Sequence, residues 1–400
     1  MKNLHGNIRK LYAFSFLQMT LFPMAIITLF WKDHIGLTLT QILLLQSIFS
    51  LATLALDYPA GYISDRLGYR CALNIASLLG IIGWGIYTVA GSFGTVLLAE
   101  ILLGMSLSFV SGSDSALLFE TLRAEGEEHT YARHEGRMNG FGQFGEAAGA
   151  LLAGVIYAYA PVLPFILQVG VWIAALCVTR QLADTPRVRA IPVRSHLAEA
   201  LATARYAFGE NRHLRYTILL STVLGISSFF PVWLIQPYMQ HSGVPLAWFG
   251  PIWACANLTV ALCALASHRM HALLGDRSMV LLFVGLVAAG YLGLGMSVGV
   301  WGVLCYFLLT CMRGLRGPMM LAHTQGESSS ANRAATLSLQ SVSFRLLFVC
   351  TGPLVGKLAD SAGVRQTFQL LFYAFLIALP PLAFLFLKNA PRRSKGKGLN

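Results

Sequence analysis

Charged side chains are scarce in this sequence. Asp, Glu, Lys and Arg make up 12% of the 400 residues, whereas 56% are hydrophobic. A soluble domain carries about 25% charged residues, so the scarcity excludes a soluble globular protein. Apolar stretches of about 20 residues, long enough to cross the hydrocarbon core of a bilayer as helices, recur along almost the whole chain. The sequence therefore predicts an all-α integral membrane protein with many spanning helices.

The sequence also lacks motifs for cofactor, metal and nucleotide sites. Its seven cysteines are scattered, with no C-x-x-C pair, which favours neither a disulfide framework nor a metal site. No Walker-type phosphate loop is present. The pattern G-x-G-x-x-G at 140–145 lies inside a predicted helix, and G-x-S-x-G at 295–299 lies at a predicted outer loop, so neither follows a strand. We expect no cofactor, no metal and no enzymatic activity.

Twelve stretches have the length and apolarity of membrane-spanning helices. The net charge of +12 marks topology rather than a nucleic-acid partner. If the N-terminus is cytoplasmic, the only lysines and arginines in predicted outer loops are Lys32, Lys357 and Arg365. This asymmetry agrees with the positive-inside rule. We predict a multi-pass protein of a bacterial-type plasma (inner) membrane with both termini in the cytoplasm. The spans are expected at residues 11–31, 40–62, 71–90, 94–119, 137–159, 162–182, 214–238, 246–267, 278–297, 300–322, 335–356 and 366–387.

The longest polar stretch divides these spans six and six. It predicts an N-terminal six-helix bundle at 1–182, a cytoplasmic linker at 183–213, a C-terminal six-helix bundle at 214–388 and a basic cytoplasmic tail at 389–400. Within the linker, "HLAEALATARYAF" predicts a short amphipathic helix along the membrane surface.

The two halves also carry similar short motifs. "GYR" at residues 68–70 is echoed by "GDR" at 275–277, and "GALLAG" at 149–154 by "GPLVG" at 352–356. The two offsets are close to each other, which supports two pseudo-symmetric bundles in parallel repeat. Many transporters share this plan.

The stretch "GYISDRLGYR", residues 61–70, carries charges and glycines between two apolar runs. Gly61 would let two helices approach closely, and Gly68 would permit a tight turn. Asp65 could cap a neighbouring helix N-terminus, where the helix dipole favours an anion. The alternative is a basic loop that only sets topology.

The same stretch resembles the signature loop of the major facilitator superfamily, G-x-L-a-D-r-x-G-r-r/k, in the same place between the second and third spans. "DYPAG" before it is similar to that family's E-x-P-x-G lead-in, with Asp57 at the acidic position. The resemblance implies alternating access by two rocking bundles, with a cavity lined by spans one, four, seven and ten. Arg66 and Arg70 would then pair with carboxylates of the facing half. The expected conformational latch comprises Asp57, Gly61, Asp65, Arg66, Gly68 and Arg70.

Three acids fall within predicted spans: Glu100 and Asp114 in the fourth and Glu146 in the fifth. Ionisable groups there are costly and are functional candidates by default. All three are candidates for proton coupling, because a buried carboxyl can take up and release a proton as access alternates. Asp114 also suits an ion pair between the halves. Glu146 could instead be neutral and hydrogen-bonded beside the close-packing pattern Gly145-x-x-x-Gly149.

The fourth span is expected to carry a polar stripe that faces a water-filled cavity, because lipid cannot satisfy polar side chains. On one continuous helix, Asp114 would lie roughly 40° around the axis from Glu100. The stripe recurs at three- and four-residue steps and consists of Glu100, Gly104, Ser108, Ser111 and Ser115.

Three arginines fall within the C-terminal spans: Arg313 and Arg316 in the tenth and Arg345 in the eleventh. Each guanidinium presents a planar fork of donors, so together they could clamp an anionic group of a substrate. The offset from Asp114 to Arg316 is close to that of the repeat, so these two could face each other across the pseudo-twofold axis. The alternative is that the arginines only neutralise the three acids.

The seventh span, "SSFFPVWLIQPYMQ", combines aromatic rings with an amide. Phe230, Trp233 and Gln236 are candidate substrate-binding residues, because such side chains suit an organic ligand. An interfacial aromatic belt is an equally natural role for Trp233.

Two positions depart from the drug–proton antiporter branch of the family. Glu100 stands where that branch has Arg, four residues before Gly104, and Gly149-Ala150 stands where it has Gly-Pro. We expect a monomeric, proton-coupled secondary transporter of a small organic solute. Export of a drug-like, siderophore-like or other anionic metabolite is preferred. The alternatives are an importer, or symporter, of a small organic acid or metabolite, and a membrane-embedded lipid-modifying enzyme.

Overall fold

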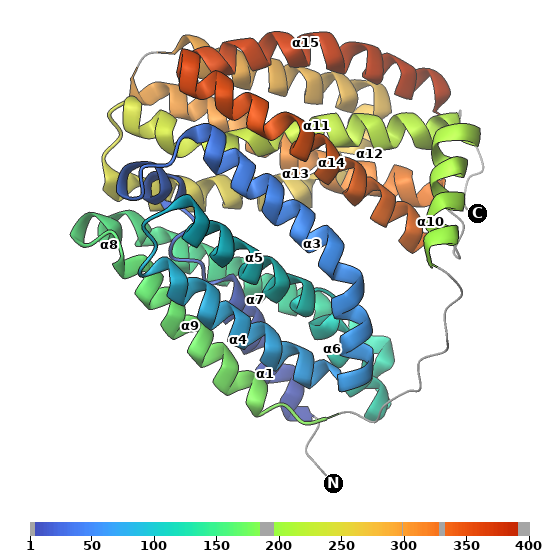
Figure 1. Ribbon diagram of the computed structural model, residues 1–400. Helices are drawn as coiled ribbons and strands as arrows, with labels where there is room; N and C mark the ends of the chain where they lie inside the picture. Colours follow the sequence, from blue (N-terminus) through green and yellow to red (C-terminus); the bar gives the residue numbers. More distant parts are fainter. Residues whose placement is uncertain (1–4, 185–195, 298, 328–332, 391–400) are drawn as a thin grey trace. The chain divides into compact units, whose positions relative to one another are not determined.

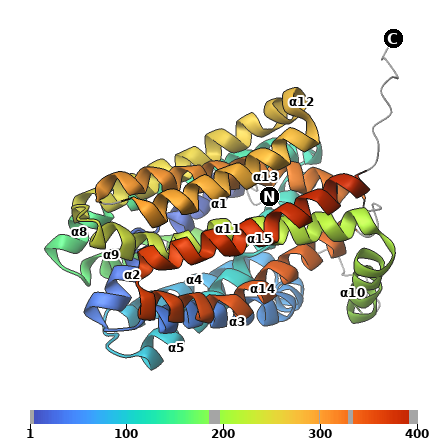
Figure 2. The same ribbon diagram turned by 90° about the horizontal axis from the view of Figure 1, so that it is seen from above.

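Every element in the described part of the chain is a helix (Figures 1 and 2). The computed structural model describes residues 5–184, 196–297, 299–327 and 333–390. No strand occurs among them, because spanning segments in lipid must satisfy their backbone hydrogen bonds internally. The all-α fold class is therefore confirmed.

The helices of the N-terminal half are mostly as long as a bilayer requires. Their bounds are α1 His5–Met19, α2 Ile27–Leu29, α3 Leu39–Leu67, α4 Tyr69–Tyr87, α5 Phe93–Val110, α6 Ser113–Ala124, α7 Tyr131–Leu151, α8 Ala153–Tyr159 and α9 Leu163–Arg180. Short 3-10 or π turns lie at Phe30–His34 and Glu128–Thr130.

The C-terminal half begins with α10, His196–Arg205, where the sequence predicts the short linker helix. Residues 185–195 of the predicted linker and 391–400 of the predicted tail lie outside the described residues. The remaining helices are α11 Arg212–His241, α12 Phe249–Met296, α13 Leu304–Gly326, α14 Arg333–Ala362 and α15 Val364–Asn389, with short turns at Tyr206–Glu210, Leu246–Trp248 and Val300–Val303.

Among the described residues, eight helices are long and apolar enough to cross a membrane. One of them, Leu246–Met296, contains two of the predicted spans, which meet at the non-helical residue Gly275. The helices are consistent with the predicted twelve spans, although not every span forms one unbroken helix.

The first predicted span, 11–31, is interrupted. Helix α1 ends at Met19, and the chain reaches α2 only at Ile27, through a segment that contains Pro23. Proline has no backbone N–H and disfavours helical geometry in the residue before it. The Phe22 N–H finds its acceptor in the side-chain oxygen of Gln168 on α9, 3.0 Å away. The expectation of one continuous helix is wrong here.

The fourth predicted span, 94–119, is also interrupted, at Gly112. Gly112 has φ 81°, the left-handed region that favours glycine, and it separates α5 from α6. The regular rotation of a helix cannot be carried across this break. The predicted angle between Glu100 and Asp114, and a single stripe running from Glu100 to Ser115, are therefore wrong.

The echo between the two halves extends to the backbone. Gly68 separates α3 from α4 with φ 95°, and Gly275 breaks α12 with φ 72°. Only glycine adopts such angles without strain. Both glycines thus join consecutive antiparallel segments in the same way, as the repeated "GYR" and "GDR" motifs predict.

The chain forms two compact units. Unit 1 contains Met1–Pro192 together with Gln236–Asn257 and Val349–Ser361, and unit 2 contains the remainder. Unit 1 therefore includes two stretches of the C-terminal half. The six-and-six division of the membrane helices stays a prediction.

Glycines allow close helix packing within unit 1. A Cβ on Gly145 or Gly149 of α7 would overlap backbone atoms of Phe16 or Leu21 in and after α1. Such small-residue contacts are typical of membrane helix interfaces. The close-packing pattern predicted beside Glu146 is therefore confirmed.

The same kind of contact attaches the C-terminal stretches of unit 1. A Cβ on Gly154 of α8 would overlap the carbonyl oxygen of Leu246, and one on Gly356 of α14 would lie 2.7 Å from that of Leu39. These two glycines stand at the repeated "GALLAG" and "GPLVG" motifs, so the pseudo-symmetry places two equivalent close approaches in unit 1. We call them the paired glycine contacts.

An acidic cap lies beside the Gly356 contact. One oxygen of Asp360 accepts the Leu39 N–H and the other accepts the Thr40 N–H, both at 2.8 Å, and the Thr40 hydroxyl adds a third bond at 2.6 Å. The first N–H groups of a helix have no partner within it. Asp360 therefore fastens the end of α14 to the start of α3.

Replacing Asp360 with Ala should destabilise this junction by about 1 kcal/mol, the usual cost of losing an N-terminal helix cap. The measurement is thermal unfolding of the purified protein in detergent, compared with Lys357→Ala. Lys357 is exposed on the same helix, so its replacement should leave the midpoint unchanged. Equal midpoints for the Asp360 variant and wild type would contradict the capping role.

Candidate functional site

A polar cavity lies within unit 2, between α11, α13 and α14. Its volume is about 340 Å³, and it is lined by Ser221, Thr222, Arg316, Leu321, Leu337, Gln340, Ser341 and Phe344. Arg316 is the one charged residue among these lining side chains. The cavity is therefore electropositive, with an apolar and hydroxyl-bearing wall.

Arg316 is held in place by α11. Its Nη1 donates to the Ser221 carbonyl oxygen at 2.6 Å and to the Ser221 Oγ at 3.2 Å. Gln340 donates to the same hydroxyl at 2.7 Å and accepts from Thr324 at 3.0 Å. A Cβ on Gly225 would lie 3.2 Å from Nη1, so the glycine makes room for the guanidinium. This network fixes the arginine's orientation.

Two polar atoms of lining residues remain without partners. The Nε of Arg316 and the Oγ1 of Thr222 are hidden from solvent, and neither has a hydrogen-bond partner among the described residues. Buried donors without partners are costly. Arg316 also lines the cavity, and a guanidinium is suited to carboxylate or phosphate oxygens.

The other two predicted arginines do not line this cavity. Arg313 is exposed on α13, and Arg345 is partly buried on α14. The expected clamp of three arginines is therefore not assembled in unit 2. The helical positions explain the difference: Arg313 and Arg316 are three residues apart with different exposure, and only Arg316 faces Ser221.

A second polar cluster lies in unit 1, around Glu100. This carboxylate is 5% exposed and accepts hydrogen bonds from the Tyr87 hydroxyl at 2.5 Å and from the Gln46 amide at 2.9 Å. Tyr87 stacks on Phe165, with ring centroids 5.1 Å apart, inside an aromatic group that includes Trp31. No cation lies within ion-pair distance of Glu100 in the described part of the chain.

The Glu100 side of α5 packs against helices rather than a cavity. Gly104 faces Thr53 and Phe49 of α3, and the Ser108 hydroxyl donates to the Thr53 carbonyl at 3.4 Å. The expected water-facing stripe is therefore wrong for these residues. A polar stripe can be satisfied by neighbouring helices as well as by water.

The other two acids also have local partners. Glu146 on α7 accepts from the Asn257 amide at 2.7 Å, within unit 1. Asp114 lies in the first turn of α6 and accepts the Ser115 N–H at 2.7 Å. The break at Gly112 creates this helix start, where the dipole favours an anion. An ion pair of Asp114 with Arg316 stays a prediction, because the two belong to different units.

The candidates on α11 are buried. Phe230, 2% exposed, packs on Phe348, and Trp233 is 6% exposed. Gln236 accepts the Thr28 N–H and donates to the Met24 carbonyl, both at 2.9 Å. Its amide ties α11 to the segment around α2, and its contact with a substrate stays a prediction.

The loop of residues 61–70 differs in part from its predicted role. Gly68 makes the tight turn as expected. A Cβ on Gly61 would meet nothing within 4 Å, so no described helix of unit 1 approaches it closely, and an approach by the facing half stays a prediction. Asp65 accepts from Tyr69 at 3.2 Å rather than capping another helix, and Asp57 is exposed.

The two arginines of this loop bind within unit 1. Arg70 donates to Asp184 at 3.1 Å and to the Arg180 carbonyl at 2.7 Å, at the end of α9. The last carbonyls of a helix attract cations, which explains this partner; pairing of the loop arginines with carboxylates of the other half stays a prediction. Arg66 lies 4.5 Å from the Tyr62 ring centroid, a cation–π arrangement.

Sequence reasoning missed the polar partners of both clusters. Ser221 and Gln340 position Arg316, and Gln46 and Tyr87 position Glu100. Gln46 and Gln340 are amides inside predicted spans, and that rarity was an available signal. Ser221 and Tyr87 gave none, because both residue types are frequent in membrane helices.

The sequence was compared with protein families and with proteins of known function. The family model described as the Major Facilitator Superfamily matches residues 11–328. The fosmidomycin resistance protein of Escherichia coli (strain K12) is 29% identical over 240 residues, which is 57% of each chain. The match thus spans little more than half the length of this curated relative.

Solved structures of transporters share the fold at low identity. The nucleoside transporter NupG has a TM-score of 0.78 at 13% identity, covering 97% of this chain and 99% of its own. A bacterial homologue of the human lysosomal transporter Spinster has a TM-score of 0.77 at 14% identity, covering 98% of this chain and 100% of its own. A POT family transporter in complex with 5-aminolevulinic acid has a TM-score of 0.73 at 13% identity, covering 98% of this chain and 97% of its own.

All of these structural relatives are transporters, in agreement with the expectation that the chain is not an enzyme. The family match extends over more than three quarters of the sequence and includes the loop at residues 61–70 that suggested it. The chain belongs to the Major Facilitator Superfamily.

Proposed function

We propose that this protein is a secondary active transporter that moves a small organic anion across the plasma membrane by alternating access, coupled to protons. The observation that carries the proposal is the cavity of unit 2, in which Arg316 is the one charged lining residue. A cation held inside apolar spans is costly unless something compensates it. A substrate anion would supply that compensation for part of the transport cycle.

The chemistry of the cavity supports a solute that combines an acidic group with an apolar body. Arg316, Thr222 and Ser341 bring polar side chains to the cavity, whereas Leu321, Leu337 and Phe344 line the same space. Apolar walls with a few placed polar groups are typical of small-molecule sites. The volume of about 340 Å³ suits a metabolite-sized molecule.

Glu100 is the preferred proton carrier of the three acids. Its carboxylate is buried, with no cation beside it among the described residues, and its two partners are neutral donors. An uncompensated buried carboxylate gains from taking up a proton, and loses it again when water reaches the site. Glu146 is a second candidate, since it accepts a hydrogen bond from the neutral amide of Asn257.

Alternating access needs contacts that form at one side of the membrane and break later. The paired glycine contacts and the Asp360 cap suit this role, because they join segments of both halves within unit 1. Gln236 adds hydrogen bonds to the segment around α2. By the predicted topology all of them lie at the outer side, so we assign them to an outer gate.

Export is the preferred direction. The support is the resistance protein of Escherichia coli, to which part of this chain is similar, since removal of a toxic compound is a direct route to resistance. Import of a small organic acid by proton symport is the alternative, and the same cavity and carboxyl would serve it. We expect a monomer, embedded in the inner membrane with both termini in the cytoplasm.

Replacing Arg316 with Gln should weaken binding of carboxylate- or phosphate-bearing solutes about 10- to 100-fold, because it removes charge-assisted hydrogen bonds worth about 1.5–3 kcal/mol. Binding of neutral analogues should change little. The measurement is a ligand-induced thermal shift over matched pairs of acidic and neutral compounds. Arg313→Gln is the control, since Arg313 does not line the cavity. Equal losses in both variants would remove Arg316 from the site.

Replacing Glu100 with Gln should abolish solute movement driven by a pH gradient while leaving exchange down a solute gradient intact. The amide keeps an oxygen that can accept from Tyr87 but cannot take up or release a proton near neutral pH. Proteoliposomes with an internal pH dye report proton and solute flux together. Glu128→Gln, at an exposed position, is the control. Proton coupling that persists in the Glu100→Gln variant would contradict Glu100 as the proton carrier and leave Glu146 as the candidate.

Adding a methyl group at Gly154 or Gly356 should hold the outer gate open, because the Cβ would overlap backbone across the contact. The probe is Thr28→Cys, at a fully buried side chain, in a background without the native cysteines. A membrane-impermeant maleimide should label it faster in Gly154→Ala and Gly356→Ala. Gly285→Ala is the control, since a Cβ there meets nothing within 4 Å. Unchanged labelling in both glycine variants would contradict the gate.

A further inference from the structure

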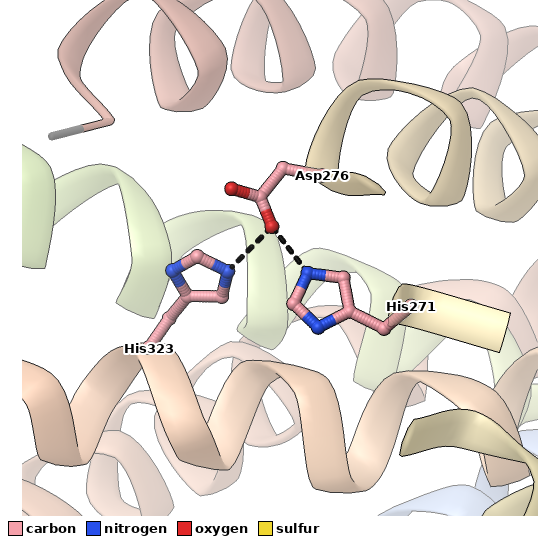
Figure 3. A group of neighbouring side chains, drawn as sticks. All are labelled: His271, Asp276 and His323. Atoms are coloured by element: carbon pink, nitrogen blue, oxygen red, sulfur yellow. Dashed lines mark hydrogen bonds and ion pairs between the residues drawn. The ribbon is translucent and has the colours of Figure 1, made fainter. Parts of the chain in front are cut away.

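A cluster of two imidazoles and one carboxylate lies in unit 2, away from the Arg316 network. One oxygen of Asp276 lies 2.5 Å from His271 Nε2 and 3.1 Å from His323 Nε2. The ligand atoms of all three residues lie within 4.8 Å of one another. Figure 3 shows both rings directed at the same carboxylate oxygen. We propose that His271, Asp276 and His323 form a binding site for a divalent transition metal ion, of which Zn²⁺ fits best.

The donor set favours a transition metal. Two imidazole nitrogens and a carboxylate oxygen are ligands that Zn²⁺ accepts in tetrahedral sites, usually with water in the fourth position. Co²⁺ and Ni²⁺ take the same ligand types. Mg²⁺ and Ca²⁺ prefer oxygen ligands throughout, so they should compete poorly here.

The backbone brings the three residues together in advance. Gly275 has φ 72° and ψ 172° and breaks α12, which lets Asp276 turn back toward His271 although both come from one helical stretch. His323 comes from α13, 47 residues further along the chain. An ion bound here would therefore fix the angle at the Gly275 break and join it to α13.

The site can be reached by ions and has a further imidazole beside it. The side chains of His271, Asp276 and His323 are 15%, 26% and 13% exposed. The His213 ring lies 5.6 Å from that of His323. His213 is 6% exposed, and its Nδ1 is buried without a hydrogen-bond partner among the described residues. That nitrogen would accept a hydrogen bond from water on the fourth position of the ion.

Neighbouring charges do not oppose the ion strongly. Arg269 and Arg277 flank the cluster in sequence, but both are exposed, and solvent screens exposed charges. The rival arrangement is a hydrogen-bonded His–Asp–His group that binds only protons. The two differ in their response to metal, which the experiment below measures.

The test is Co²⁺ and Zn²⁺ binding to the full-length protein, purified in detergent without a polyhistidine tag. Co²⁺ should produce the visible absorption of a tetrahedral site at one ion per chain, and Zn²⁺ should displace it and raise the unfolding temperature. Loss of a residue that only hydrogen-bonds to a metal ligand lowers metal affinity about 10- to 100-fold. His271→Ala and His323→Ala each remove a ligand itself, so each should weaken Zn²⁺ binding by more than that. Mg²⁺ should have no effect.

His268→Ala is the matched control, since His268 is exposed on the same helix and should keep wild-type binding. Asp276→Asn keeps the size of the side chain and should weaken binding without unfolding the protein, as shown by an unchanged metal-free unfolding temperature. Absence of the Co²⁺ band in wild type overturns the proposal. Binding that survives in the His271→Ala, His323→Ala double variant is adventitious and overturns it as well.

Discussion

One constraint governs this molecule: a polar group inside the hydrocarbon must find its partner within the protein. Helices satisfy the backbone, so the remaining demand falls on side chains. Gln46 and Tyr87 meet it for Glu100, and Ser221 meets it for the terminal nitrogen of Arg316. The demand is left unmet at several buried polar atoms of the described residues, among them Arg316 Nε and Thr222 Oγ1. What distinguishes these two atoms is that their residues also line the cavity of unit 2.

The repeat of the two halves determines where helices can approach and turn. Gly68 and Gly275 provide the same left-handed joint in each half, and Gly154 and Gly356 provide the same close approach. Pairs of this kind require glycine for geometric reasons, so they persist where other residues diverge. The two halves are nevertheless not interchangeable, because the buried acid Glu100 lies in the N-terminal half and the cavity-lining Arg316 lies in the C-terminal half.

The sequence predicted the fold well, and it singled out some of the residues that make up the candidate sites. Runs of about 20 apolar residues and the loop at 61–70 were sufficient for the all-α class and the family. Helix interruptions at Pro23 and Gly112 were missed because hydropathy averages over a window and does not register one residue. Glu100 and Arg316 were found because charge is rare in a span. Their hydrogen-bond partners were not predicted, since helical periodicity indicates which face of a helix a residue lies on but not which neighbour covers that face. For the same reason the partners of Arg70 in the loop at 61–70 were not predicted.

Asp360 has a further consequence. By the offset that relates Gly154 to Gly356, its counterpart in the first half is Ala158, an exposed residue on α8. The Gly356 contact is thus strengthened by a carboxylate on a helix dipole, whose effect falls as ionic strength rises. The Gly154 contact has no acidic side chain at the matching position and depends on close backbone packing, which salt does not weaken. Changes of salt would therefore act on one of the paired glycine contacts and not on the other.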